Sequence, residues 1–246
     1  MGIGEALARA FASRGARVMM SSRDAAKLTE ARNRVGALER TMAVPCDVRD
    51  RQQIEALVRA TQDAFARIDV WINNAGQGML DSVSSMSMDE CRKMFDTNLF
   101  GAIECMQAVV PALKAQGSGT IINISSVVGH LPVPHMGAYS ATKHALNAIS
   151  EAARLELESS GIRVISVCPG RIRTNFGVNA VKGTEVKRMG GALQRGISPE
   201  RCARAIVRGY MRGTREVFVP WHGWVVSHLY EMFPGMVEFG MRRMMN

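Results

Sequence analysis

Short apolar runs alternate with longer amphipathic stretches along most of the chain. The stretch 50–67 is typical of a helix, because Ile54, Leu57, Val58 and Phe65 recur at helical spacing and share one face. The apolar runs have the length of buried strands and lie at 17–22, 41–48, 69–72, 120–126, 161–168 and 216–220. Helical patterns cover 24–40, 50–67, 87–110 and 139–159, and another begins at Ser198. This alternation predicts an α/β fold in one domain, residues 1–246, with a parallel sheet and helices on both faces.

The chain begins directly in a helical pattern, with no strand before it. Gly2 and Gly4 stand at the start of this helix, where small residues let the backbone approach a phosphate and free N–H groups form an anion site. We therefore expect the first strand, normally central in such a sheet, to be missing, because the start is misassigned or the sequence is incomplete.

Two later segments do not fit the alternation. Residues 175–197 show little apolar periodicity and several glycines, so we interpret them as a substrate loop or lid. Residues 221–246 form an apolar tail interrupted by Pro234. The tail has three interpretations, an apolar lid, an oligomer contact or a membrane-surface helix, of which the membrane helix is the least favoured.

Composition narrows the class of protein. A chain of 246 residues that is 47% hydrophobic suits one large soluble domain. The net charge is +9, but basic residues are spread out, so no nucleic-acid-binding tract is indicated. The five cysteines are scattered without metal-ligand spacing, and predict reduced thiols and no metal site. Since we find no signal peptide and no run of eighteen apolar residues, we expect a cytoplasmic protein without a spanning helix.

The strongest candidate chemistry lies between Ser126 and Lys143. Tyr139 and Lys143 are four residues apart, so in a helix their side chains share one face. We expect the lysine ammonium to lower the pKa of the phenol and make it a usable acid near neutral pH. Ser126 ends the 120–126 strand, where an open α/β sheet holds its active groups. Alone, a Tyr-x-x-x-Lys pattern is usual in solvated helices and a serine after a strand is usually a turn residue.

Further polar residues are candidates for binding. Arg23 directly follows the 17–22 strand, and an arginine near that position accommodates a 2′-phosphate, so Ser22 and Arg23 favour NADP(H) over NAD(H). Asn98 lies inside a long helical pattern, where asparagine is a poor residue, and Gly101 follows it. This pair indicates a local kink, although an exposed asparagine is an equal alternative.

The chain resembles one known family through an ordered set of motifs. The set closely resembles that of the short-chain dehydrogenase/reductase family, and its members are Gly2-Ile3-Gly4, Asn73 to Gly76, Asn98, Ser126, Tyr139-x-x-x-Lys143 and Pro169-Gly170. Within the family, the segment from Ser126 to Tyr139 is similar to that of 3-oxoacyl-carrier-protein reductases and hydroxysteroid dehydrogenases. The resemblance implies a Rossmann-like doubly wound sheet. Only Gly-Ile-Gly remains of the family's longer glycine-rich turn, which puts cofactor affinity in question.

The resemblance also implies roles. Tyr139 would exchange a proton with the substrate oxygen, Lys143 would lower its pKa and hold the nicotinamide ribose, Ser126 would bond that oxygen, and Asn98 would anchor a water. The cofactor-binding set implied by the resemblance and by the Arg23 argument is Gly2, Ile3, Ser22, Arg23, Asp47, Val48, Asn74, Ala75, Gly76, Tyr139, Lys143, Pro169, Gly170, Ile172 and Thr174.

These observations together predict a function. We expect an NADP(H)-dependent oxidoreductase that interconverts a carbonyl and an alcohol on a medium-sized apolar small molecule. From the family we expect a homodimer or homotetramer, and no nucleic-acid partner. Two alternatives remain: a non-catalytic dinucleotide-binding sensor or scaffold of the same fold, and a nucleotide-sugar epimerase, for whose usual C-terminal domain the chain has little room.

Overall fold

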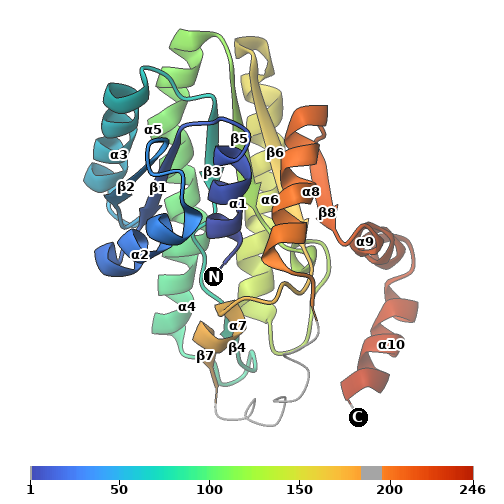
Figure 1. Ribbon diagram of the computed structural model, residues 1–246. Helices are drawn as coiled ribbons and strands as arrows, with labels where there is room; N and C mark the ends of the chain where they lie inside the picture. The colour runs from blue at the N-terminus through green and yellow to red at the C-terminus, as the bar shows by residue number, and fades with distance from the viewer. Residues whose placement is uncertain (1, 184–195, 246) are drawn as a thin grey trace.

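The computed structural model describes residues 2–183 and 196–245, and its strands form a parallel sheet in two parts (Figure 1). The larger part has the order β3-β5-β6-β8 and the smaller part pairs β1 with β2, all parallel. Their bounds are β1 Val18–Ser22, β2 Thr41–Pro45, β3 Val70–Asn73, β5 Gly119–Ile124, β6 Ile162–Pro169 and β8 Glu216–Val219. The predicted α/β fold is confirmed.

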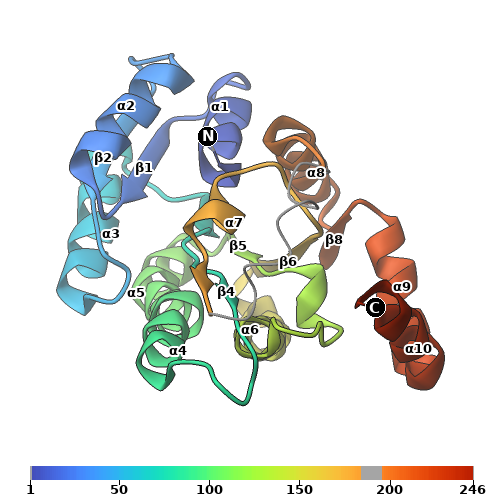
Figure 2. The same ribbon diagram turned by 90° about the horizontal axis from the view of Figure 1, so that it is seen from below.

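Helices cover both faces of the larger sheet (Figures 1 and 2). The helices α1 and α8 pack together on one face, and α5 and α6 lie on the other. The main helices are α1 Ile3–Ala12, α2 Ala25–Val35, α3 Arg51–Phe65, α4 Met88–Phe95, α5 Gly101–Gln116, α6 Gly137–Leu157 and α8 Pro199–Arg212.

The strand β5 is buried on both sides, which explains its unbroken apolar sequence. Ile121 packs with Val109 and Leu113 of α5, while Ile122 packs with Leu7 of α1 on the opposite face. All of these side chains except Leu7, at 2%, have no exposed surface. Because successive side chains of a strand point to opposite faces, a doubly covered strand needs apolar residues at every position.

Helix boundaries follow local capping chemistry. Asp24 and Asp50 cap α2 and α3 by accepting hydrogen bonds from backbone N–H groups of the first turn. Ser198 does the same for α8, with Pro199 in the first turn. The predicted helix 24–40 is too long, because α2 ends at Val35 and Gly36 takes φ +74°, a left-handed value that glycine tolerates.

The predicted irregularity near Asn98 is confirmed. Between α4 and α5 the chain forms a π-helical segment, η1 Asp96–Phe100, before regular geometry resumes at Gly101. A Cβ at Gly101 would lie 2.7 Å from the carbonyl oxygen of Val48, so the close approach of these two segments requires glycine there. Segments of π-helix are frequent at functional sites because they re-aim one side chain.

The two parts of the sheet are separated by an apolar space. Within the described ranges, no strand pairs with both β1 and β3. The space between them is lined by Val18 and Met20 of β1, Val70 and Ile72 of β3, and Leu7 of α1. The sequence analysis expected the first strand to be missing, and the sheet is divided at this place.

The predicted substrate loop 175–197 contains short regular elements in its first part. Residues Phe176–Asn179 form the short helix α7, and β7 Val181–Lys182 pairs with β4 Met79–Leu80. Near the other end, Ile197 bridges to Ile172. The remainder, residues 184–195, lies outside the described residues.

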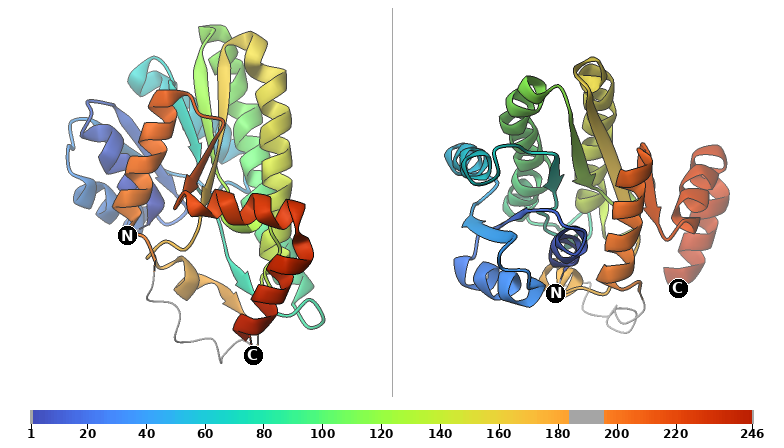
Figure 3. Two further views of the ribbon diagram at one scale, coloured as in Figure 1. Left: turned by 90° about the vertical axis from the view of Figure 1, so that its right-hand side faces the viewer. Right: turned by 45° about the horizontal axis from the view of Figure 1, so that its top comes forward.

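The tail forms two helices that extend beside the main body (Figure 3). They are α9 His222–Met232 and α10 Pro234–Met245, so the predicted break at Pro234 is confirmed. Trp221, Phe233 and Phe239 are 74%, 53% and 60% exposed. Among the helices of the described ranges, none combines the length and apolar character needed to cross a bilayer.

Candidate active site

A cavity of about 1760 Å³ runs along the carboxyl ends of the strands and continues into the space between β1 and β3. Carboxyl ends at such a change of strand order are where open α/β sheets bind ligands. The structure brings most of the predicted site residues to this cavity: Gly2, Ile3, Ser22, Arg23, Val48, Asn74, Ala75, Gly76, Ser126, Tyr139, Lys143, Pro169, Gly170, Ile172 and Thr174. Asp47 and Asn98 are absent from the lining.

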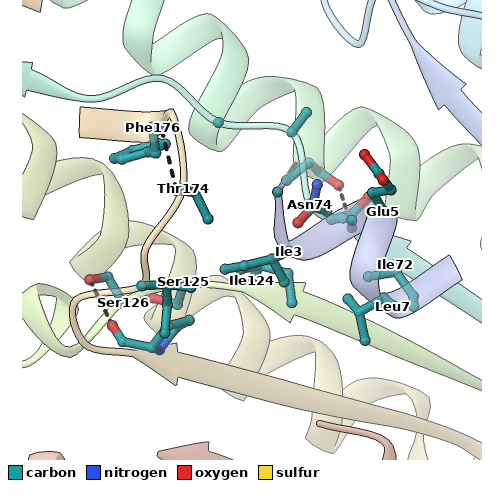
Figure 4. Close-up of a pocket in the computed structure, with 18 of the residues that line it drawn as sticks. Ile3, Glu5, Leu7, Ile72, Asn74, Ile124, Ser125, Ser126, Thr174 and Phe176 are labelled. Carbon is teal, nitrogen blue, oxygen red and sulfur yellow. Dashed lines mark hydrogen bonds between the residues drawn. The ribbon is translucent and has the colours of Figure 1, made fainter. Parts of the chain in front are cut away.

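Ser126 and Tyr139 lie together at one end of the cavity. Ser126 follows β5, caps the short helix η2 Val127–Gly129, and donates a hydrogen bond to the carbonyl oxygen of Pro169 at 3.3 Å (Figure 4). Tyr139 lies in the first turn of α6, and the neighbouring Ser126 side chain acts to lower the pKa of its phenol. Both residues line the cavity.

Lys143 lies one helical turn after Tyr139 and is 3% exposed. Its Nζ donates a hydrogen bond to the carbonyl oxygen of Ile124 at 2.9 Å and stands 5.8 Å from the centre of the Tyr139 ring. Burial lowers the pKa of Lys143 to about 8, because an ammonium group inside the protein loses its hydration. The lysine is thus positioned by β5 as well as by its own helix.

The expected lowering of the Tyr139 pKa is wrong for the protein alone. Burial raises the pKa of the phenol to about 12, and the hydrogen bond with Ser126 only partly offsets this rise. Lys143 makes its hydrogen bond to the carbonyl oxygen of Ile124, and its charge is not among the causes that shift the pKa of Tyr139. Sequence spacing brings the two residues to one face, but desolvation outweighs their charge interaction here.

Asn98 is not among the residues that line the cavity. It is 1% exposed, accepts a hydrogen bond from the backbone N–H of Gln77 at 2.7 Å and donates one to the same residue's carbonyl oxygen at 2.8 Å. Its amide nitrogen also contacts the Thr142 hydroxyl at 3.2 Å. The π-helical turn therefore directs Asn98 toward the loop after β3, close to Tyr139 and Lys143 in α6 but without lining the cavity.

Asp47 is also absent from the cavity lining. Its carboxylate is held by the guanidinium of Arg49, which lowers the pKa of Asp47, and the charge of Arg23 lowers it further. Arg23, after β1, lines the cavity at its far end from Tyr139. Val48 lines the cavity beside it, so this end combines an arginine with apolar surface.

Two residues of the site were missed by the sequence analysis. The Phe176 ring lies 5.6 Å from the Tyr139 ring and covers it, and a Cβ at Gly78 would come within 2.9 Å of the Phe176 ring. Thr142 is fully buried and donates a hydrogen bond to the Tyr139 carbonyl oxygen. Both are close to predicted residues in the sequence, but no local pattern distinguishes them from ordinary neighbours.

The lining of the cavity fits a pyridine dinucleotide. At one end Gly2 caps α1 without a side-chain bond, and a Cβ placed there would meet nothing within 4 Å. The first N–H groups of a helix lack partners within the helix and attract phosphate. Near the other end, a Cβ placed at Gly76 would lie at ordinary contact distance from the side chains of Asn98 and Lys143. Residues that could hold a phosphate and a flat ring thus lie at opposite ends of one cavity.

Comparison with known proteins adds independent findings. The sequence model of a family described as short chain dehydrogenase matches residues 1–185. A ketoacyl reductase named HetN from Nostoc sp. is 36% identical over 219 residues, which cover 89% of this chain and 75% of that protein.

Solved structures are also similar. A short-chain dehydrogenase from Burkholderia cenocepacia, solved in complex with NADP, is similar with a TM-score of 0.81 and 27% sequence identity. The match covers 98% of this chain and 92% of the Burkholderia chain. A short-chain dehydrogenase/reductase from Burkholderia phymatum, solved with NAD, has a TM-score of 0.85 over 94% of this chain and 89% of its own. At 21% identity, this second likeness supports the fold alone.

Proposed function

The chain belongs to the short-chain dehydrogenase/reductase family, and from that premise we propose that it is an NADP(H)-dependent oxidoreductase that interconverts a carbonyl and an alcohol. The observation that carries the proposal is that Ser126, Tyr139 and Lys143 line the same cavity, with Lys143 one helical turn after Tyr139. Two hydroxyl groups on the wall of one cavity can hold one substrate oxygen between them.

Each residue of the site would have its own role in the reaction. NADPH, when bound, would supply the hydride to the carbonyl carbon. Ser126 would donate a hydrogen bond to the carbonyl oxygen, and Tyr139 would give that oxygen its proton as negative charge develops. A phenol whose pKa is about 12 stays protonated at neutral pH, which suits a proton donor. Lys143, when charged, would stabilise the phenolate that remains.

The choice of NADP(H) rests on charge at the far end of the cavity. Arg23 lines that end, where a guanidinium can hold a 2′-phosphate in a bidentate manner. The carboxylate of Asp47, whose pKa is lowered by the charge of Arg23, is already paired with Arg49. Asp47 is therefore not free to bind a ribose 2′-hydroxyl.

The proposed substrate is a medium-sized apolar carbonyl compound or alcohol. The cavity near Tyr139 is lined by Met79, Val133, Met136 and Val226, and the last of these comes from α9 of the tail. This contact favours the lid interpretation for α9, whereas α10 has no described residue in the lining. We further propose a homodimer or homotetramer, as family resemblance implies, and a cytoplasmic location, as the scattered cysteines suggest.

The test is NADPH oxidation over a panel of ketones and aldehydes of increasing apolar size. Tyr139→Phe should lower kcat by about 10²–10⁴-fold, the usual contribution of a positioned acid. Tyr210→Phe is the matched control, because Tyr210 lies in α8 outside the cavity lining. Unchanged turnover in Tyr139→Phe would refute the mechanism.

A second experiment tests the cofactor. Arg23→Asp should shift the ratio of kcat/KM for NADPH over NADH by at least about a hundredfold, since it replaces an attractive charge with a repulsive one. An unchanged ratio contradicts the NADP(H) assignment. Tight NADPH binding by calorimetry, without turnover on any carbonyl of the panel, would instead favour the non-catalytic sensor.

A further inference from the structure

Three side chains with metal-binding atoms converge behind the proposed active site. His130 follows η2, Cys168 lies in β6, and Glu216 begins β8. His130 Nε2 stands 3.3 Å from Cys168 Sγ and 3.4 Å from Glu216 Oε1, and the three ligand atoms all lie within 4.8 Å of one another. None of these residues lines the dinucleotide cavity.

Buried polar atoms around this cluster lack partners. Asn147 of α6 is 5% exposed, and its Nδ2 lies 3.1 Å from the same His130 Nε2. Its Oδ1 has no hydrogen-bond partner among the described residues, nor has the Oγ of Ser166, which is 1% exposed. Glu216 Oε1 makes no hydrogen bond with the described residues either, although it lies within ion-pair distance of His130. A buried polar atom without a partner is costly, so this arrangement points to a ligand that the protein is built to hold.

The spacing of the three ligand atoms suits a tetrahedral metal ion. With zinc–sulfur bonds near 2.3 Å and zinc–nitrogen or zinc–oxygen bonds near 2.0–2.1 Å, a tetrahedron separates sulfur from nitrogen by about 3.6 Å and nitrogen from oxygen by about 3.3 Å. The corresponding distances are 3.3 Å and 3.4 Å. A thiolate, an imidazole and a carboxylate together favour Zn²⁺ over the hard cations.

We propose that His130, Cys168 and Glu216 form a Zn²⁺ site, with a water as the fourth ligand and the Asn147 carbonyl oxygen available to accept a hydrogen bond from that water. The side chains of His130 and Glu216 are 12% and 28% exposed, which gives an ion a route from solvent to the buried sulfur.

Charge balance is consistent with a divalent ion. Binding converts the Cys168 thiol to a thiolate and releases one proton to solvent, so the ion meets one thiolate and one carboxylate and their charges sum to zero. Burial raises the pKa of the Cys168 thiol, so without a metal the thiol is protonated. The other charged groups that act on the cluster are Lys143, Glu151 and Arg154 of α6 and His228 of α9.

The site would join three elements that surround the proposed catalytic serine. His130 is four residues after Ser126, and Cys168 precedes Pro169, whose carbonyl oxygen accepts the Ser126 hydrogen bond. Glu216 opens the next strand, paired with Ser166 of β6. A metal here would hold the segment after β5 against β6 and β8, and its role is structural since it does not reach the cavity.

The test uses the full chain without a histidine tag, stripped with a chelator under reducing conditions and titrated with Co²⁺ as a spectroscopic substitute for Zn²⁺. We expect one equivalent to bind with a near-ultraviolet thiolate-to-cobalt band, and Zn²⁺ to displace it. Cys168→Ser should abolish the band, and Glu216→Gln and His130→Ala should weaken binding at least about tenfold. Cys202→Ser is the matched control, because Cys202 is equally buried and lies in α8 away from the cluster.

A second measurement keeps the test decisive if Cys168→Ser does not fold. X-ray absorption at the zinc edge of the reconstituted chain should show one sulfur at about 2.3 Å and nitrogen or oxygen ligands at about 2.0–2.1 Å. The proposal is overturned by substoichiometric binding, by a spectrum without sulfur, by a band that survives in Cys168→Ser, or by its loss in Cys202→Ser. None of these readouts depends on the proposed oxidoreductase activity.

Discussion

Replacing Lys143 with methionine should make the protein more stable while removing its activity. Lys143 is 3% exposed, and among the described residues its ammonium group donates a hydrogen bond to the carbonyl oxygen of Ile124. A buried charge with so little compensation is costly, and methionine fills nearly the same space without a charge.

The magnitude follows from the pKa of Lys143, which burial lowers from 10.5 to about 8. At about 1.4 kcal/mol for each factor of ten in the ionisation constant, the charged form costs the folded state about 3 kcal/mol at pH 7. Leaving the Ile124 carbonyl oxygen without its donor costs about 1 kcal/mol. The expected net gain for Lys143→Met is therefore about 2 kcal/mol in the free energy of unfolding.

The sign of the pH dependence is specific to a lowered lysine pKa. Between pH 8 and 10.5 the unfolded chain binds the proton and the folded chain does not, so the stability of the unmodified protein rises with pH in that window. The advantage of the variant should be complete below about pH 8 and should shrink toward pH 10.5.

Urea unfolding of both proteins at pH 7 and pH 10 measures this difference directly. Lys114→Met, at an exposed position in the last turn of α5, controls for the change in composition. A variant that is less stable than the parent at pH 7, or a gain that is the same at both pH values, would refute the reasoning.

Three further changes have defined outcomes. Leu113→Ala should lower the free energy of unfolding by about 2–5 kcal/mol in urea titrations, because Leu113 has no exposed surface; a loss below about 1 kcal/mol would contradict its place in the core. Asn98→Ala should lower kcat at least tenfold and cost about 1–3 kcal/mol of stability, since it removes both hydrogen bonds to the Gln77 backbone; full activity would exclude a positioning role. Phe176→Ala should expose Tyr139 and lower its pKa, so the basic limb of the pH profile for kcat/KM should move to lower pH, and an unmoved limb would contradict the burial argument.

The raised pKa of Tyr139 changes how the pairing with Lys143 should be understood. In the protein alone, burial keeps the phenol protonated and lowers the pKa of the neighbouring lysine, so each group is biased toward its neutral form. A buried pair of this kind is sensitive to whatever enters the cavity, because any added charge or hydrogen bond acts in a poorly hydrated environment. We therefore expect the ligands to set the working pKa values of the site.

The sequence alone was sufficient for the order of the main elements and for most of the predicted residues that line the cavity. Apolar runs such as 120–126 predict buried strands because a doubly covered strand cannot alternate. Asp24, Asp50 and Ser198 mark helix starts because capping is a local interaction. Parallel strands all end at one edge of the sheet, so residues that follow them gather there. Ser126, Tyr139 and Lys143 line the cavity at that edge.

Tertiary structure alone decided what depends on burial and on contacts between distant segments. Burial reversed the expected direction of the Tyr139 pKa, and the π-helical turn directed Asn98 to the backbone of Gln77. Phe176 reaches Tyr139 only because α7 folds back beside β4, and His130, Cys168 and Glu216 meet only because β6 and β8 are neighbours. Desolvation and long-range approach depend on the whole packed chain, and a linear pattern does not encode them.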